Sequence, residues 1–142
     1  MKGHNIAVST FSFILIITGS FGIMTIPLAY SQTSSFDVQN IPAKKVHVGD
    51  IDIAYKTFGK GEPILLFNGA SDGMDAWDPS FLTGLSSNHT VIVFDSRGIG
   101  NTTAGSKPYT MQLLASDAAG LMDALKIKQA NVLGYSLGGE TA

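Results

Sequence analysis

The sequence predicts an α/β fold, in which a mostly parallel β-sheet follows an N-terminal β-hairpin. Short continuous apolar runs of strand length alternate along the chain with stretches of helical spacing. Strands that are separated by helices pair in parallel through right-handed crossovers. Each apolar run is followed by a loop that contains Gly or Asp, and in open α/β sheets binding sites form at this end of the strands. We therefore expect a site at the carboxyl ends of the strands.

The predicted strands begin with a hairpin. The stretches 46–48 and 51–55 are rich in Val and Ile, and Gly49-Asp50 divides them, which is a hairpin signal. The continuous apolar run at 64–67 is typical of a strand that is buried on both faces, and residues 90–94 are expected to form a second buried strand. A further strand is expected at residues 130–133.

Two helices are predicted between these strands. Residues 75–87 suit a helix through the spacing of their apolar side chains, with an irregularity at Pro79. Thr110 can cap a second helix, since apolar residues then follow at intervals of three and four up to Leu125.

The first 31 residues differ in composition from the rest. No charged residue occurs from Asn5 to Phe36, and Lys2 precedes this apolar segment. We interpret residues 1–31 as a secretory signal peptide that is cleaved after Ser31, which predicts a secreted or extracytoplasmic protein. The alternative is an uncleaved anchor, with membrane association through residues 6–30. The mass of the mature N-terminus distinguishes the two interpretations.

The remaining chain is predicted to contain a polar linker at residues 32–43 and one domain at residues 44–142. The chain has 9 Lys and Arg and 11 Asp and Glu without a basic stripe, which argues against nucleic acid as a partner. It has no cysteine, which excludes a thiol nucleophile, a Cys-ligated metal and a disulfide.

The motif G-x-S-x-G occurs once, at residues 134–138. On its own it is a weak signal, because an ordinary Gly-rich loop between a strand and a helix has the same appearance. Its context favours a nucleophile elbow, since a predicted strand precedes it and a helix can begin at Leu137. Gly134 and Gly138 leave room for a sharp turn that a side chain would obstruct. Such a turn exposes the Ser136 hydroxyl above the sheet.

From about residue 44 to 142 the chain resembles the N-terminal half of an α/β-hydrolase. Four segments match motifs of that family in order, namely residues 67–70, 94–100, 121–125 and 132–139. The first of these has Asn68 where the family has His, and the second reads D-x-R-G-x-G. The resemblance implies an incomplete fold of the α/β-hydrolase type.

The resemblance also implies a chemistry. Ser136 would be the nucleophile that attacks a small-molecule acyl substrate, without metal or cofactor. The backbone N–H groups of Ala70 and Leu137 would form the oxyanion hole. Asn68 is expected to shape the loop, as Asn can hydrogen-bond locally. For Asp95 we favour an ion pair with Arg97 that shapes the loop after the strand, and a catalytic acid is the alternative.

The acid and the histidine that complete the triad are not apparent. In this family both follow the serine along the chain. Here only Glu140 follows as an acid, and the histidines are His4, His47 and His89. His89 precedes a strand, so we expect it at the end of the sheet opposite Ser136. We therefore expect this chain to be an inactive fragment with an open sheet edge, or else a binding protein that retains the fold without catalysis.

Overall fold

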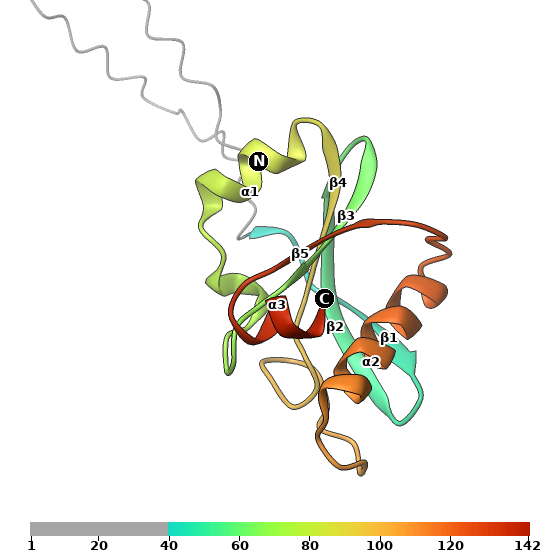
Figure 1. The fold of residues 1–142 in the computed structure, drawn as a ribbon. Coiled ribbons are helices and arrows are strands. Elements are labelled where there is room, and N and C mark those ends of the chain that lie inside the picture. Colours follow the sequence, from blue (N-terminus) through green and yellow to red (C-terminus); the bar gives the residue numbers. More distant parts are fainter. Residues whose placement is uncertain (1–39) are drawn as a thin grey trace, which may run out of the picture. The chain divides into compact units, whose positions relative to one another are not determined.

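A five-stranded mixed sheet in the order β1-β2-β4-β3-β5 forms the centre of the structure (Figure 1). The computed structural model describes residues 40–142. The predicted signal peptide or anchor at residues 1–31, and the predicted linker up to residue 39, lie outside the described residues. The described part of the chain has no helix that is long and apolar enough to span a membrane.

The predicted hairpin and parallel strands are confirmed. β1 (Lys44–Val48) and β2 (Ile51–Gly59) pair antiparallel, and β2 also pairs antiparallel with β4 (His89–Phe94). β3 (Glu62–Phe67) lies between β4 and β5 (Asn131–Gly134) and is parallel to both. The carboxyl ends of β3, β4 and β5 therefore lie side by side at one end of the sheet.

Helices cover both faces of this sheet. α1 (Pro79–Ser86) buries Leu82 in a cluster with side chains of β2, β3 and β4. α2 (Met111–Ala124) buries Ala118 and Leu121 against the opposite face. The short α3 (Leu137–Thr141) follows β5 and packs beside α2 (Figure 1). Ile64 and Leu66 of β3 are in the first cluster, and Leu65 and Phe67 are in the second. Burial on both faces explains why residues 64–67 are all apolar.

The helix predicted over residues 75–87 is divided in two. A 3-10 turn, η2 (Met74–Ala76), precedes α1, and Trp77 between them is extended (φ −66°, ψ 138°). α1 begins with Pro79, and the Asp78 carboxylate caps it by accepting from the N–H groups of Ser80 and Phe81. A residue before proline disfavours helical backbone angles, which is why one helix cannot run through this segment.

β5 is partly exposed, in contrast to β3 and β4, whose apolar residues are buried. Asn131 is exposed and Val132 is 49% exposed. Within residues 40–142, β3 is the only strand that pairs with β5, so β5 lies at the edge of the sheet. This agrees with the expectation of an open edge beside the elbow.

Candidate active site

The turn between β5 and α3 has the sharp geometry of a nucleophile elbow. Ser136 has φ 54° and ψ −124°, a region that non-glycine residues rarely adopt. Hydrogen bonds from Gly138 N–H to Tyr135 O (2.9 Å) and from Gly139 N–H to Ser136 O (2.8 Å) close the turn. Neither bond uses the N–H of Leu137. Ser136 itself is exposed.

Both glycines of the motif are required by close backbone packing. A Cβ on Gly134 would lie within 3.0 Å of the Gly138 backbone, and one on Gly138 would lie equally close to the carbonyl oxygens of Phe67 and Asn68. The N–H of Tyr135 also donates to Phe67 O at 3.1 Å. The elbow is thus pressed against the end of β3.

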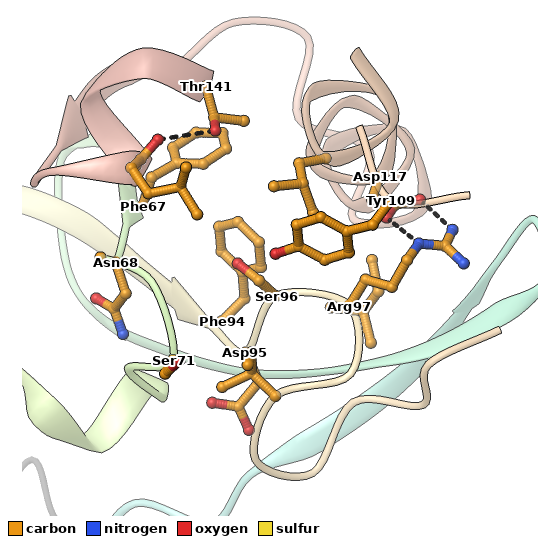
Figure 2. A pocket seen from close by; sticks show the side chains of 16 residues that line it. Phe67, Asn68, Ser71, Phe94, Asp95, Ser96, Arg97, Tyr109, Asp117 and Thr141 are labelled. Carbon is orange, nitrogen blue, oxygen red and sulfur yellow. Dashed lines mark hydrogen bonds and ion pairs between the residues drawn. The ribbon is translucent and has the colours of Figure 1, made fainter. Parts of the chain in front are cut away.

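The loop after β3 and the start of α3 line one pocket (Figure 2). Gly69 and Ser71, which flank Ala70, are in its wall together with Leu137. This places the segments of the two predicted oxyanion donors beside each other, while their function as donors stays a prediction. The other side chains of the wall are of two kinds. Apolar and aromatic ones come from Ile53, Phe67, Phe94, Ile99, Tyr109 and Leu114, and polar ones from Asn68, Asp95, Ser96, Arg97, Asp117 and Thr141.

Asn68 shapes the loop, as expected. Its side chain is buried, and its Nδ2 donates to the carbonyl oxygens of Asp72 (3.4 Å) and Gly73. Because these bonds join the start of the loop to its end, they close it into a compact turn. The amide therefore serves the local structure at the position where the related family carries a histidine.

The predicted ion pair between Asp95 and Arg97 is wrong. The Asp95 carboxylate is buried and accepts from the backbone N–H groups of Met74 (2.7 Å) and Asn101 (2.8 Å). Its two oxygens thus hydrogen-bond to backbone on two loops. Arg97, whose side chain is also buried, points away toward α2 (Figure 2).

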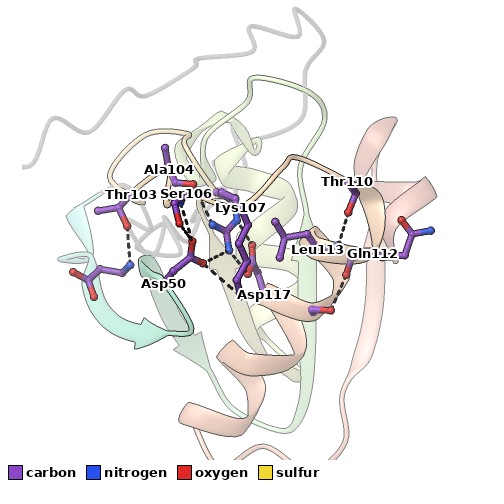
Figure 3. Close-up of polar contacts among 12 residues, drawn as sticks. Asp50, Thr103, Ala104, Ser106, Lys107, Thr110, Gln112, Leu113 and Asp117 are labelled. Atoms are coloured by element: carbon purple, nitrogen blue, oxygen red, sulfur yellow. Dashed lines mark hydrogen bonds and ion pairs between the residues drawn. The ribbon is translucent and has the colours of Figure 1, made fainter.

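The true partners of Arg97 are Asp50 and Asp117. Its guanidinium bonds both oxygens of Asp117 (2.8 Å each) and one oxygen of Asp50 (2.9 Å) (Figure 3). The hydrogen bonds that Arg97 donates to Asp117, and then to Asp50, raise the pKa of Arg97 above its ordinary value. The bond from Arg97, and after it the N–H of Ser106, lowers the pKa of Asp50.

Sequence reasoning missed this network, although one signal was available. Asp117 lies on the apolar stripe of α2, between Leu114 and Leu121. A carboxylate on the buried face of an amphipathic helix requires a buried partner, because an unpaired charge there is costly. Nothing in the local pattern identifies Asp50 as the second partner, since it is 47 residues from Arg97.

The described histidines lie away from the elbow. His89 pairs in register with Glu62 at the start of β3, whereas Gly134 pairs with Phe67 at its end. His89 is therefore at the opposite end of the sheet from Ser136, as predicted. His47 lies in the hairpin, 2.9 Å from Asp52, on the strand at the far edge. Residues 40–142 contain no cluster of His, Cys, Asp or Glu that could hold a metal ion.

The family model of the alpha/beta hydrolase fold matches residues 62–142. This chain belongs to that family. The matched residues include the elbow, the loop with Asn68 and the Asp95–Arg97 segment. The similarity to the family therefore covers the parts of the chain that form the candidate site. The resemblance stated from the motifs is confirmed.

Relatives of this alpha/beta hydrolase chain include enzymes with different names. A non-heme chloroperoxidase from Streptomyces lividans is 36% identical over 90 residues, which are 62% of this chain and 33% of that protein. The 3-oxoadipate enol-lactonase 2 of Acinetobacter baylyi is 33% identical over 94 residues (65% and 35%). The chain therefore spans about a third of the length of the curated relatives it matches.

Solved structures of the same family have a similar fold. The crystal structure of the enol-lactonase from Burkholderia xenovorans LB400 superposes with a TM-score of 0.66 at 34% identity, covering 69% of this chain and 39% of that one. The alpha/beta hydrolase fold protein from Chitinophaga pinensis gives 0.65 at 32% identity, with coverages of 70% and 37%. The mixed sheet described above is thus part of the fold of these larger proteins.

Proposed function

We propose that this chain carries the nucleophile of a serine hydrolase that cleaves a carboxylic ester, amide or related acyl bond. The observation that carries the proposal is the backbone of Ser136, which has a positive φ between β5 and α3. Strained backbone of this kind persists where the surrounding structure fixes it, and it concentrates at functional sites. Relatives named as an enol-lactonase support chemistry at an acyl carbon.

The proposed steps are those that membership of the family implies for a serine nucleophile. The Ser136 Oγ attacks the acyl carbon, the carbonyl oxygen becomes an oxyanion, and the N–H groups of Leu137 and Ala70 stabilise it by hydrogen bonds. The leaving alcohol or amine departs with a proton, and water then releases the acid from the acyl-enzyme. Losing one such N–H donor typically slows catalysis by on the order of 100- to 1000-fold.

A serine hydroxyl needs a base to lose its proton, and this need limits the activity expected here. The described histidines, His47 and His89, lie away from Ser136. We therefore propose that the 142-residue chain has little hydrolase activity by itself. A base supplied from solution should restore part of the reactivity.

The experiment uses an alkyl fluorophosphonate with the 142-residue chain. Ser136 Oγ forms a bond to phosphorus, fluoride leaves, and the proton passes to buffer or to added imidazole. We expect slow modification of Ser136, identified by peptide mass, at a rate that rises with neutral imidazole. The label should be absent in Ser136→Ala and unchanged in Ser87→Ala, which alters an exposed serine at the end of α1.

The outcomes separate the two parts of the proposal. Modification that persists in Ser136→Ala, or that spreads over exposed serines, would show that Ser136 is not the nucleophile. It would favour the alternative of a binding protein that retains the fold. Fast modification of Ser136 without imidazole would contradict only the proposed low activity of the chain.

A further inference from the structure

The loop between β3 and η2 contains a strained residue. Ser71 has φ 67°, a left-handed conformation that is unfavourable for a non-glycine residue unless local contacts compensate. The loop also contains Ala70, whose N–H is the second predicted oxyanion donor. Hydrogen bonds within the loop, or from neighbouring segments, must therefore stabilise the left-handed conformation of Ser71.

Two side chains fix the loop. Asn68 acts from within, through Nδ2 bonds to Asp72 O and Gly73 O. Asp95 acts from the neighbouring strand, because its Oδ1 accepts from the Met74 N–H at 2.7 Å, just after the loop. Figure 2 shows Asn68, Ser71 and Asp95 on adjacent segments at the rim of the pocket.

Asp95 is itself rigidly placed at the end of β4. Its N–H donates to Ala54 O on β2 (2.9 Å), which continues the pairing of β4 with β2. Its Oδ2 accepts from the Asn101 N–H (2.8 Å), and the residue is 2% exposed. The Met74 bond thus connects the loop to the rigid part of the sheet.

The chemistry of this position requires a carboxylate. Two backbone N–H groups converge on the side chain, and only an ionised Asp or Glu offers two acceptor oxygens without a donor. Within residues 40–142 no ion pair includes Asp95, and the side chain instead accepts from these two backbone N–H groups. A Cβ at Gly73 would lie 3.1 Å from Oδ1, which shows how closely the loop approaches.

We propose that Asp95 is a positioning residue for the oxyanion hole. Its carboxylate fixes the Met74 N–H and so keeps the loop in the conformation that presents the Ala70 N–H next to Leu137. In this role Asp95 acts through the loop and not directly on the substrate, so we assign it positioning and not the task of a catalytic acid. This inference rests on the proposed function, because it assigns a task to Asp95 in the same reaction.

The test compares Asp95→Asn with Thr102→Val. Asn is of similar shape, but its NH₂ group would face one of the two N–H donors. Val removes the Thr102 hydroxyl, which donates to the backbone oxygen of Asp95 and accepts from the Ala54 N–H (2.8 Å each). This change leaves the Asp95 carboxylate and its hydrogen bond from the Met74 N–H in place. Both variants lose buried hydrogen bonds, so the second is a matched control for lost stability, which urea denaturation measures for each.

The first readout is fluorophosphonate kinetics with imidazole at a temperature where both variants are folded. For Asp95→Asn we expect the limiting rate to fall about 10-fold or more, because small misplacements of a catalytic group can cost up to about 100-fold. The half-saturating probe concentration should not change. Thr102→Val should stay within about 2-fold of the unmodified chain in both quantities. Equal losses of limiting rate in the two variants would overturn the proposal.

The second readout is amide hydrogen exchange at Ala70 and Ser71. Asp95→Asn should raise exchange there at least 10-fold more than Thr102→Val does, and unchanged exchange would also overturn the proposal. This readout needs no reactive serine. If Ser136 proves unreactive in the unmodified chain, the proposed function fails, while the exchange data still decide whether Asp95 fixes the loop.

Discussion

At the scale of the residue, the elbow depends on two positions that must have no side chain. Gly138→Ala would place a Cβ within 3.0 Å of the carbonyl oxygens of Phe67 and Asn68. We expect a loss of about 1–3 kcal/mol in the free energy of unfolding, as is usual for overpacking, measured by urea denaturation.

Gly139→Ala is the matched control, one residue further along α3. The nearest atom to its Cβ would be Gly134 O at 3.4 Å, which is an ordinary contact. Because Ala is a better helix former than Gly, this variant should keep or gain up to about 1 kcal/mol. Equal destabilisation by the two substitutions would show that the contact with β3 does not define the turn.

How much of the site the sequence predicts depends on how local each interaction is. The elbow is built from five consecutive residues, so its strand, turn and glycines could be predicted from the motif. Asn68 contacts residues only four and five positions away, and its structural task was also predictable. Arg97 bonds residues 20 and 47 positions away, and proximity along the chain suggested Asp95 instead.

At the scale of the element, α1 shows how a cap defines a helix. Asp78 accepts from the side chain and N–H of Ser80 and from the Phe81 N–H, and the Ser80 hydroxyl is the largest cause that lowers the pKa of Asp78. A lowered pKa in the folded state means that folding favours the ionised carboxylate. Its stabilising contribution is therefore present above the ordinary Asp pKa of about 3.9 and is lost as the pH falls through the lowered folded value.

We predict that Asp78→Ala lowers stability at neutral pH and that the gap to the unmodified chain narrows below about pH 4. Urea denaturation from pH 7 to pH 2 measures both. Asp78→Asn is the control, because Asn caps helices as well as Asp but carries no charge. A gap between Asp78→Ala and the unmodified chain that stays constant with pH would contradict a charged cap.

The elements themselves were predicted well where one residue pattern dominates. The strands at 64–67 and 90–94 consist mainly of apolar residues, and both are confirmed with one or two further residues at the start. The segment 75–87 has helical spacing throughout, but Asp78-Pro79 places a cap and a first turn inside it. The Asp-Pro pair was the stronger indication of where the helix begins, and a prediction from apolar spacing alone overlooked it.

At the scale of the whole molecule, Arg97 joins parts of the chain that no strand pairing connects. It contacts the hairpin turn at Asp50, the carbonyl oxygen of Ala104 (3.1 Å) in the loop after β4, and Asp117 on α2. The side chain of Arg97 is 2% exposed, and that of Asp117 is 8% exposed. Since Arg97 and Asp117 also line the pocket beside the elbow, the network connects the hairpin to the candidate site.

Arg97→Met should therefore lower the free energy of unfolding by about 3 kcal/mol, because it leaves Asp117 buried without its partner. Lys107→Ala removes a cation that is half exposed and 3.8 Å from the same Asp50, and it should cost much less. The double variant Arg97→Met with Asp117→Leu should recover part of the loss, as apolar residues often replace a buried ion pair without penalty. If the double variant is no more stable than Arg97→Met, the loss comes from the loop and the hairpin, which Arg97 also bonds, and not from the unpaired charge on α2.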